Sequence, residues 1–186
     1  MIGAAFTAAG QNPWLSQGDL FREVIISRVG VEDGVAAVGV ERGPALLMSH
    51  DCVLDKKRKS NRREVSRVDF LTFVPIRGFA QVNPEKARAL REFGAALDVR
   101  PYEALYLGEV DGVGEAWVSL AHPYTIPALL LGTQLRAFTD AETGDGEDTR
   151  LVASIGDTRV GKLSPGGMAL LRKKWMAHWT GEVPKD

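Results

Sequence analysis

Cysteine is almost absent from this sequence. Its 186 residues include one cysteine, Cys52, so no intrachain disulfide can form. Disulfide-stapled secreted domains depend on paired cysteines, whereas a lone thiol suits a reducing compartment. We therefore expect a cytoplasmic protein stabilised by a hydrophobic core, which a chain of this length can build as one domain.

Long apolar runs are also missing. No stretch approaches the roughly 18 uninterrupted apolar residues of a membrane-spanning helix. The first residues lack the basic segment and the long apolar segment of a secretory signal peptide. These absences predict a soluble protein without a membrane partner, and we expect no cofactor.

Turn-forming residues are plentiful instead. Twenty glycines and nine prolines are spread along the chain, which favours a mainly β fold with short strands over a helical bundle. Asp33-Gly34 and Asp111-Gly112 are hairpin signals, and Pro123 and Pro127 bracket an expected loop. The expected strands cover residues 20–29, 35–40, 45–48, 68–76, 104–107, 116–120 and 128–138. The almost wholly apolar segment 68–76 predicts a central strand covered on both faces.

Two helices are predicted by their capping residues. Asn83, followed by proline, begins an inserted helix over about 84–97, and Ser164, also followed by proline, begins a C-terminal helix over about 165–179. The second helix should bury Met168, Leu171, Trp175 and Trp179 and expose Arg172, Lys173 and Lys174. We expect residues 1–16 to form a loose arm, 17–181 a single domain and 182–186 a frayed tail.

Charge is distributed very unevenly. Residues 56–67 hold seven Lys or Arg and one acid, so this segment carries +6 while the rest of the chain carries −7 of the total −1. Residues 140–148 hold five acids and should form a mobile loop. The basic segment could contact the phosphates of RNA or DNA, pair with the acidic loop or a protein partner, or remain a solvated loop.

The most reactive side chains gather just before the basic segment. His50, Asp51, Cys52 and Asp55 lie within six residues. A zinc site usually shows two pairs of ligands, and only one end is present here, so we expect no metal and a structural Cys52. The alternative ligand set is His50, Asp51, Cys52 and His122, and either histidine could instead activate a Cys52 nucleophile.

Several short motifs resemble the MazF/PemK family of toxins in their order along the chain. They are Gln17-Gly18-Asp19-Leu20-Phe21, the segment from Glu41-Arg42-Gly43-Pro44 to Ser49, Phe73-Val74-Pro75-Ile76, and Arg150-Leu151 followed by Leu163-Ser164 and a helix. The resemblance implies an SH3-like, partly open β-barrel that often dimerises. It also implies binding to single-stranded RNA, which family members often cut without a metal.

The chain departs from the family at the residues that carry the cleavage. Gly43 separates Arg42 from Pro44, and Arg77 occupies the position of the family's threonine. A guanidinium cannot replace a hydroxyl, but it can hold a phosphate. The resemblance therefore implies binding without an intact ribonuclease site.

Three functions follow from these observations. The first is a nucleic-acid-binding protein in which Arg42 and Arg77 line the site. The residues expected to follow the phosphates of single-stranded RNA or DNA are Lys56, Lys57, Arg58, Lys59, Arg62 and Arg63. The second is a non-enzymatic module whose charged loops bind a protein, such as a host factor or an antitoxin. The third is a metal-independent endoribonuclease in which Arg42 is catalytic.

Overall fold

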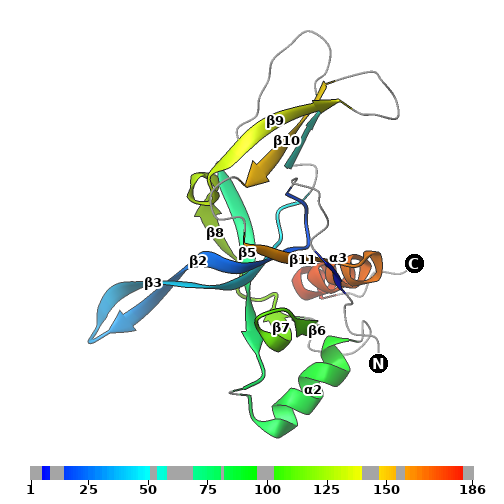
Figure 1. Ribbon diagram of the computed structural model, residues 1–186. Helices are drawn as coiled ribbons and strands as arrows, with labels where there is room; N and C mark the ends of the chain where they lie inside the picture. The colour runs from blue at the N-terminus through cyan, green and yellow to red at the C-terminus, as the bar shows by residue number, and fades with distance from the viewer. Residues whose placement is uncertain are drawn as a thin grey trace.

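The protein is mainly β, with one inserted helix and one C-terminal helix, as expected (Figure 1). The computed structural model describes residues 6–8, 15–50, 54–57, 69–80, 82–95, 103–139, 147–153 and 158–181. The strands are β1 (Phe6–Ala8), β2 (Asp19–Glu32), β3 (Val35–Leu47), β4 (Asp55–Lys57), β5 (Phe70–Gly78), β6 (Ala104–Val110), β7 (Gly114–Ser119), β8 (Tyr124–Pro127), β9 (Thr133–Thr139), β10 (Glu147–Ala153) and β11 (Arg159–Leu163). The helices described are α2 (Pro84–Gly94), α3 (Pro165–Thr180) and the short 3-10 helix η1 (Ala128–Leu131).

Eight strands form one antiparallel sheet. Seven follow the order β1-β11-β2-β3-β5-β7-β6, and β8 adds to β5. Within the described part of the chain, β1 and β6 end this order without pairing to each other, so the sheet is not closed. The position of β5 between β3 and β7 confirms the expected central strand. β4, β10 and β9 form a separate three-stranded sheet (Figure 1).

The two hairpins form at the predicted turns. Asp33 and Gly34 have φ angles of 51° and 79°, which is the pair of positive values that a tight hairpin turn between β2 and β3 requires. Gly112 follows β6 with a φ of 74° and starts the return into β7. Local sequence was therefore sufficient to position both turns.

Several strand boundaries differ from those expected. Residues 45–48 are not a separate strand, because β3 continues through Gly43 and Pro44 while pairing with β2. The expected loop between Pro123 and Pro127 contains β8, and the expected strand over 128–138 divides into η1 and β9. The expected loose arm contains β1, which pairs with β11.

The main sheet has apolar residues on both faces. Leu46 and Val74 lie opposite each other in the core cluster that α3 covers through Met168 and Leu171. Ala45, the residue next to Leu46, belongs to a second core cluster on the other face. Burial on both sides explains why β5 reads as an almost continuous apolar run.

The first turn of α2 is capped as predicted. The side chain of Asn83 accepts hydrogen bonds from the backbone N–H groups of Glu85 and Lys86, and Pro84 begins the helix. The helix ends at Gly94, earlier than the expected residue 97. It packs against β6, where a Cβ on Gly94 would lie 2.8 Å from the backbone nitrogen of Tyr106.

The orientation of α3 was only partly predicted. Ser164 caps it, and Met168 and Leu171 are buried as expected. Trp179 is 61% exposed, however, and Lys174 is fully buried. The Lys174 ammonium donates a hydrogen bond of 2.8 Å to the carbonyl oxygen of Phe93, near the end of α2. A cation is stabilised at a helix C-terminus. Because this contact joins two helices that are far apart in the chain, the sequence of α3 alone does not predict it.

None of the helices in the described residues has both the length and the apolar character needed to cross a membrane.

Candidate functional site

A cavity of about 570 Å³ opens where the end of β5 meets β7 and the start of α2. The residues that line it are Arg77, Gly78, Ala80, Val82, Asn83, Lys86 and Trp117. Six of them lie within ten residues of the chain, from the end of β5 to the first turn of α2, and Trp117 of β7 completes the cavity. We call it the Arg77 pocket.

Strand pairing brings a cation and an aromatic ring together in the Arg77 pocket. Arg77 on β5 lies directly opposite Trp117 on β7. The guanidinium carbon of Arg77 is 5.8 Å from the centroid of the Trp117 ring, within the range of a cation–π contact. Arg77 is exposed, whereas Trp117 is 8% exposed and packs with Leu90 of α2. The indole therefore forms a fixed wall beside an accessible cation.

The beginning of α2 adds a second exposed cation, Lys86. The oxygen of Asn83 accepts from the backbone N–H groups of Glu85 and Lys86 at 2.9 and 3.1 Å. These two amides already have a partner, so positive charge in the pocket comes mainly from side chains. Among the described lining residues none is acidic, which makes the Arg77 pocket suitable for an anion.

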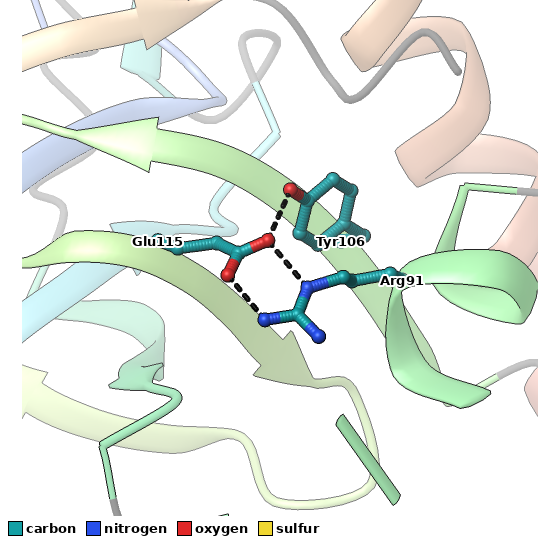
Figure 2. A network of polar contacts seen from close by, with 3 residues as sticks. All are labelled: Arg91, Tyr106 and Glu115. Atoms are coloured by element: carbon teal, nitrogen blue, oxygen red, sulfur yellow. Dashed lines mark hydrogen bonds and ion pairs between the residues drawn. The ribbon is translucent and has the colours of Figure 1, made fainter. Parts of the chain in front are cut away.

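A polar network holds α2 onto the sheet behind the pocket (Figure 2). Arg91 of α2 donates to both carboxylate oxygens of Glu115 on β7, with Nε–Oε1 and Nη2–Oε2 distances of 2.6 and 2.5 Å. The hydroxyl of Tyr106 on β6 donates to Oε1 of the same carboxylate at 2.7 Å. These donors, Arg91 first and then Tyr106, lower the pKa of Glu115 to about 2.

The same arginine also supports the turn that forms one side of the pocket. The guanidinium carbon of Arg91 lies 4.7 Å from the ring centroid of Phe79. The carbonyl oxygen of Phe79 accepts from the backbone N–H of Val82 at 2.9 Å, which closes the turn between β5 and α2. Arg91 is neutralised by Glu115 and acts as a structural cation, in contrast to the exposed Arg77.

The Arg77 pocket has the positive charge and the aromatic wall of an anion-binding site. Its lining residues within the described chain include no histidine, cysteine, hydroxyl or carboxylate side chain that could act as a nucleophile or general base. Two cations beside an aromatic wall can hold a phosphate and a flat ring instead.

Arg42, the expected partner of Arg77, lies elsewhere. It is exposed on β3 opposite Ile25 of β2. Side chains alternate along a strand, so Arg42 emerges on the face of Leu46. Arg77 emerges on the face of Pro75, which pairs with Ala45. The fold therefore does not join the two arginines into one site.

The basic segment is described only at its start. Lys56 and Lys57 belong to β4 and pair with Thr149 and Asp148 of β10. Glu147 and Asp148, expected in the mobile acidic loop, are thus in a strand. The strand that contains the start of the basic segment therefore lies beside the strand that contains the end of the acidic segment. Arg58, Lys59, Arg62 and Arg63 lie outside the described residues, as do residues 140–146.

The alternative metal ligands are not assembled by the described residues. His50 and His122 are exposed, while Asp51 and Cys52 lie outside the described chain. No group of three His, Cys, Asp or Glu side chains with the geometry of a metal site occurs in the part that is described.

The toxin-like motif before β2 has a structural role. The backbone N–H of Gly18 donates to Leu47, and Gly18 has a φ of 89°. The carboxylate of Asp19 accepts from the backbone N–H of Ser16 at 2.8 Å and lies 3.6 Å from Arg159. Burial outweighs these favourable contacts and raises the pKa of Asp19 to about 6. The motif joins β2, β3 and β11 and does not line the Arg77 pocket.

Sequence reasoning identified Arg77 but missed Lys86 and Trp117. Lys86 lies in the predicted helix 84–97 and Trp117 in the predicted strand 116–120, and neither was expected to line a site. Their only sequence signals, a cation in the first turn of a capped helix and an aromatic in a hairpin strand, are common. No protein-family model matches this chain, and a search of curated proteins finds no significant match.

Proposed function

We propose that this protein binds single-stranded nucleic acid through the Arg77 pocket without cleaving it. The observation that carries this proposal is the side-by-side arrangement of Arg77, Lys86 and the Trp117 ring around a cavity of about 570 Å³. Exposed cations attract phosphates, and a flat aromatic wall accommodates an unstacked base.

The resemblance to the MazF/PemK toxins supports the same polymer class. In this interpretation the open antiparallel sheet and α3 represent a divergent SH3-like barrel, and the basic segment extends the phosphate contacts beyond the pocket. The separation of Arg42 from Arg77 favours binding over the endoribonuclease alternative, because a cleaving site needs both charge stabilisation and proton transfer at one phosphate.

A protein-interaction role remains the second candidate. The pairing of β4 with β10 favours it, since the strands that contain the start of the basic segment and the end of the acidic segment are neighbours. Each role predicts a different dependence of binding on salt concentration and on the presence of RNA or DNA.

Fluorescence anisotropy with labelled single-stranded RNA and DNA at two salt concentrations tests the proposal. Affinity should fall with salt, with a log–log slope of about −0.7 for each phosphate contacted. Arg77→Ala and Lys86→Ala should each weaken binding and reduce the slope by about 0.7. Gel analysis of the oligonucleotide after incubation should show no shortening.

Arg88→Ala is the matched control, because Arg88 is an exposed cation on the same helix that does not line the pocket. It should leave the slope almost unchanged. Replacement of Arg58, Lys59, Arg62 and Arg63 by serine tests separately whether the basic segment contacts phosphates. Absence of binding to either polymer at low salt, or equal effects of Arg77→Ala and Arg88→Ala, would refute the pocket as a nucleic-acid site.

A further inference from the structure

Asn83 lines the Arg77 pocket and also caps α2. Its side-chain oxygen accepts hydrogen bonds from the backbone N–H groups of Glu85 and Lys86 at 2.9 and 3.1 Å. An amide nitrogen only donates, so it could not replace the oxygen opposite these two donors. The cap therefore fixes which branch of the Asn83 amide is the oxygen and which is the nitrogen.

The amide nitrogen of Asn83 is available to a ligand. The side chain is exposed, and its nitrogen has no hydrogen-bond partner among the described residues. The two branches of a planar amide diverge, so the nitrogen faces away from the backbone N–H groups that the oxygen caps. The two backbone N–H groups are occupied by the cap, and the donor that remains for the pocket belongs to the side chain.

The fold holds this donor in place. Arg91 of α2 donates to both carboxylate oxygens of Glu115 and fixes the helix on the sheet (Figure 2). The backbone N–H of Ala87 donates to the carbonyl oxygen of Asn83 at 2.8 Å, and Pro84 restricts the backbone of the first turn. A donor that is fixed before binding loses little conformational entropy when a ligand arrives.

The other polar side chains of the Arg77 pocket are donors as well. Arg77 and Lys86 have no acceptor atom, and the indole of Trp117 only donates. The remaining described lining residues have no polar side chain. Because the oxygen of Asn83 already accepts two hydrogen bonds, the described lining side chains offer donors and no free acceptor.

The bases of a nucleic acid differ in what they present to such a set of donors. Guanine carries the carbonyl oxygen O6 and uracil or thymine the carbonyl oxygen O4, whereas adenine and cytosine carry an amino group at the same position. The usual pairing of asparagine with adenine needs the side-chain oxygen to accept from that amino group. The oxygen of Asn83 is occupied by the cap, so an amino group would meet only donors.

We propose, on the basis of the nucleic-acid binding proposed above, that Asn83 makes the Arg77 pocket selective for bases with a carbonyl group. Guanine and uracil or thymine are preferred over adenine and cytosine. The amide nitrogen of Asn83 donates to the carbonyl oxygen of the base, while Arg77 and Lys86 hold phosphates. Asn83 then determines which base is accepted, and the two cations supply affinity that does not depend on sequence.

Strands that differ in one functional group test this inference. The probes are a short DNA strand of stable abasic residues and the same strand with one central adenine or one central hypoxanthine. Hypoxanthine has a carbonyl group where adenine has its amino group. Fluorescence anisotropy at low salt should show about tenfold tighter binding of the hypoxanthine strand than of the adenine strand, as expected for one specific base contact. A strand with one uracil should likewise bind more tightly than a strand with one cytosine.

Asn83→Ser and Asn83→Asp separate the cap from the donor. Serine and aspartate cap helices about as well as asparagine, so both variants should keep their fold, which circular dichroism checks. Asn83→Ser lacks the amide nitrogen and should bind the hypoxanthine and adenine strands with nearly equal affinity. Asn83→Asp presents an acceptor in its place and should prefer the adenine strand. The preference is a ratio of two affinities of one protein, so the added charge of aspartate cancels.

Arg77→Ala provides the contrasting variant. It should weaken binding of every strand, the fully abasic one included, by a similar factor and leave the preference for hypoxanthine unchanged. A loss of preference in Arg77→Ala equal to that in Asn83→Ser would overturn the division of roles between the two side chains.

The possible failures distinguish this inference from the proposed function. Equal binding of the hypoxanthine and adenine strands by the unmodified chain would overturn the selectivity and leave the proposed nucleic-acid binding in place. A preference that persists in both Asn83→Ser and Asn83→Asp would assign the selectivity to another group and overturn the role of Asn83. Absence of binding to every strand at low salt would overturn both proposals.

Discussion

The inner and outer halves of β2 and β3 are the same two strands in two different environments. In the inner halves, Leu20, Phe21 and the 45–47 segment are at most 1% exposed. In the outer halves, Val31, Val35, Val38 and Val40 are 66–73% exposed. Both halves contain β-branched and other apolar residues and pair in the same antiparallel manner. The difference is that β5, β11 and α3 cover the inner halves. In the described residues, the outer halves pair only with each other.

This comparison separates strand formation from burial. Val and Ala favour an extended, pleated backbone wherever they occur, and the Asp33-Gly34 turn brings the two strands together. Burial of a valine or leucine side chain contributes about 1.5–3 kcal/mol, however, and only a neighbouring layer supplies it. The inner halves should therefore account for most of the stability of this hairpin.

The largest expected effect tests this difference within β3 itself. Leu46→Ala removes a fully buried side chain from the core that α3 covers and should cost about 2–5 kcal/mol of unfolding free energy. Val35→Ala, in the exposed part of the same strand, should change that free energy by about 0.5 kcal/mol or less. Urea unfolding of both variants provides the comparison. Equal losses of unfolding free energy would show that the outer half of β3 is as well covered as its inner half.

A smaller effect is expected from glycine substitutions in the body and in the outer half of β2. A Cβ at Gly94 would approach Tyr106 to 2.8 Å, so Gly94→Ala should force α2 away from β6 and cost about 1–3 kcal/mol. A Cβ at Gly30 in the outer half of β2 would meet no atom within 4 Å. Gly30→Ala should therefore be neutral or slightly stabilising. Thermal unfolding that ranked these two variants in the reverse order would contradict the close packing of α2.

The smallest effects concern pH and the two perturbed carboxylates of the body. The pKa of Glu115 is about 2 in the folded state against 4.5 ordinarily, so its contribution to stability is present above pH 4.5 and is lost as pH falls toward 2. Both partners are partly exposed, which keeps the effect modest. Glu115→Gln should flatten the stability profile in this window, as followed by urea unfolding at several pH values.

Asp19 should act in the opposite direction. Its pKa is about 6 in the folded state against 3.8 ordinarily, so the folded protein holds a proton that the unfolded chain has lost between these values. Stability should consequently decline as pH rises from 3.8 to 6, and Asp19→Asn should remove this decline. A profile for Asp19→Asn that still fell across this window would assign the decline to another group.

Features that depend on neighbouring residues in the chain were predicted well. Both hairpin turns, the caps at Asn83 and Ser164, and the apolar character of the central strand required only local rules. The orientation of α3 was less predictable. The helical spacing from Met168 and Leu171 suggested a buried Trp179, but the end of α2 provides an acceptor for Lys174 on the buried side. That contact joins residues 81 positions apart.

The Arg77 pocket illustrates the same limit for the candidate site. Arg77 was predicted as a site residue from a resemblance of short motifs, and its neighbours in space are Trp117 and Lys86. Arg42 was expected beside it and emerges on the opposite face of the sheet. Strand alternation could have separated the two arginines only once the pairing of β3 with β5 was known.

The sequence by itself determined several of the extended segments, the two hairpin turns and the first residues of α2 and α3, because these depend on backbone preferences and hydrogen bonds between near neighbours. It also determined the uneven charge of the chain. Only the tertiary structure decided which side of α3 is buried, which half of the β2–β3 hairpin is covered, and which cation stands beside Trp117. Each of these depends on the register between distant strands and on the surface presented by a neighbouring layer, and neither is encoded in any single segment.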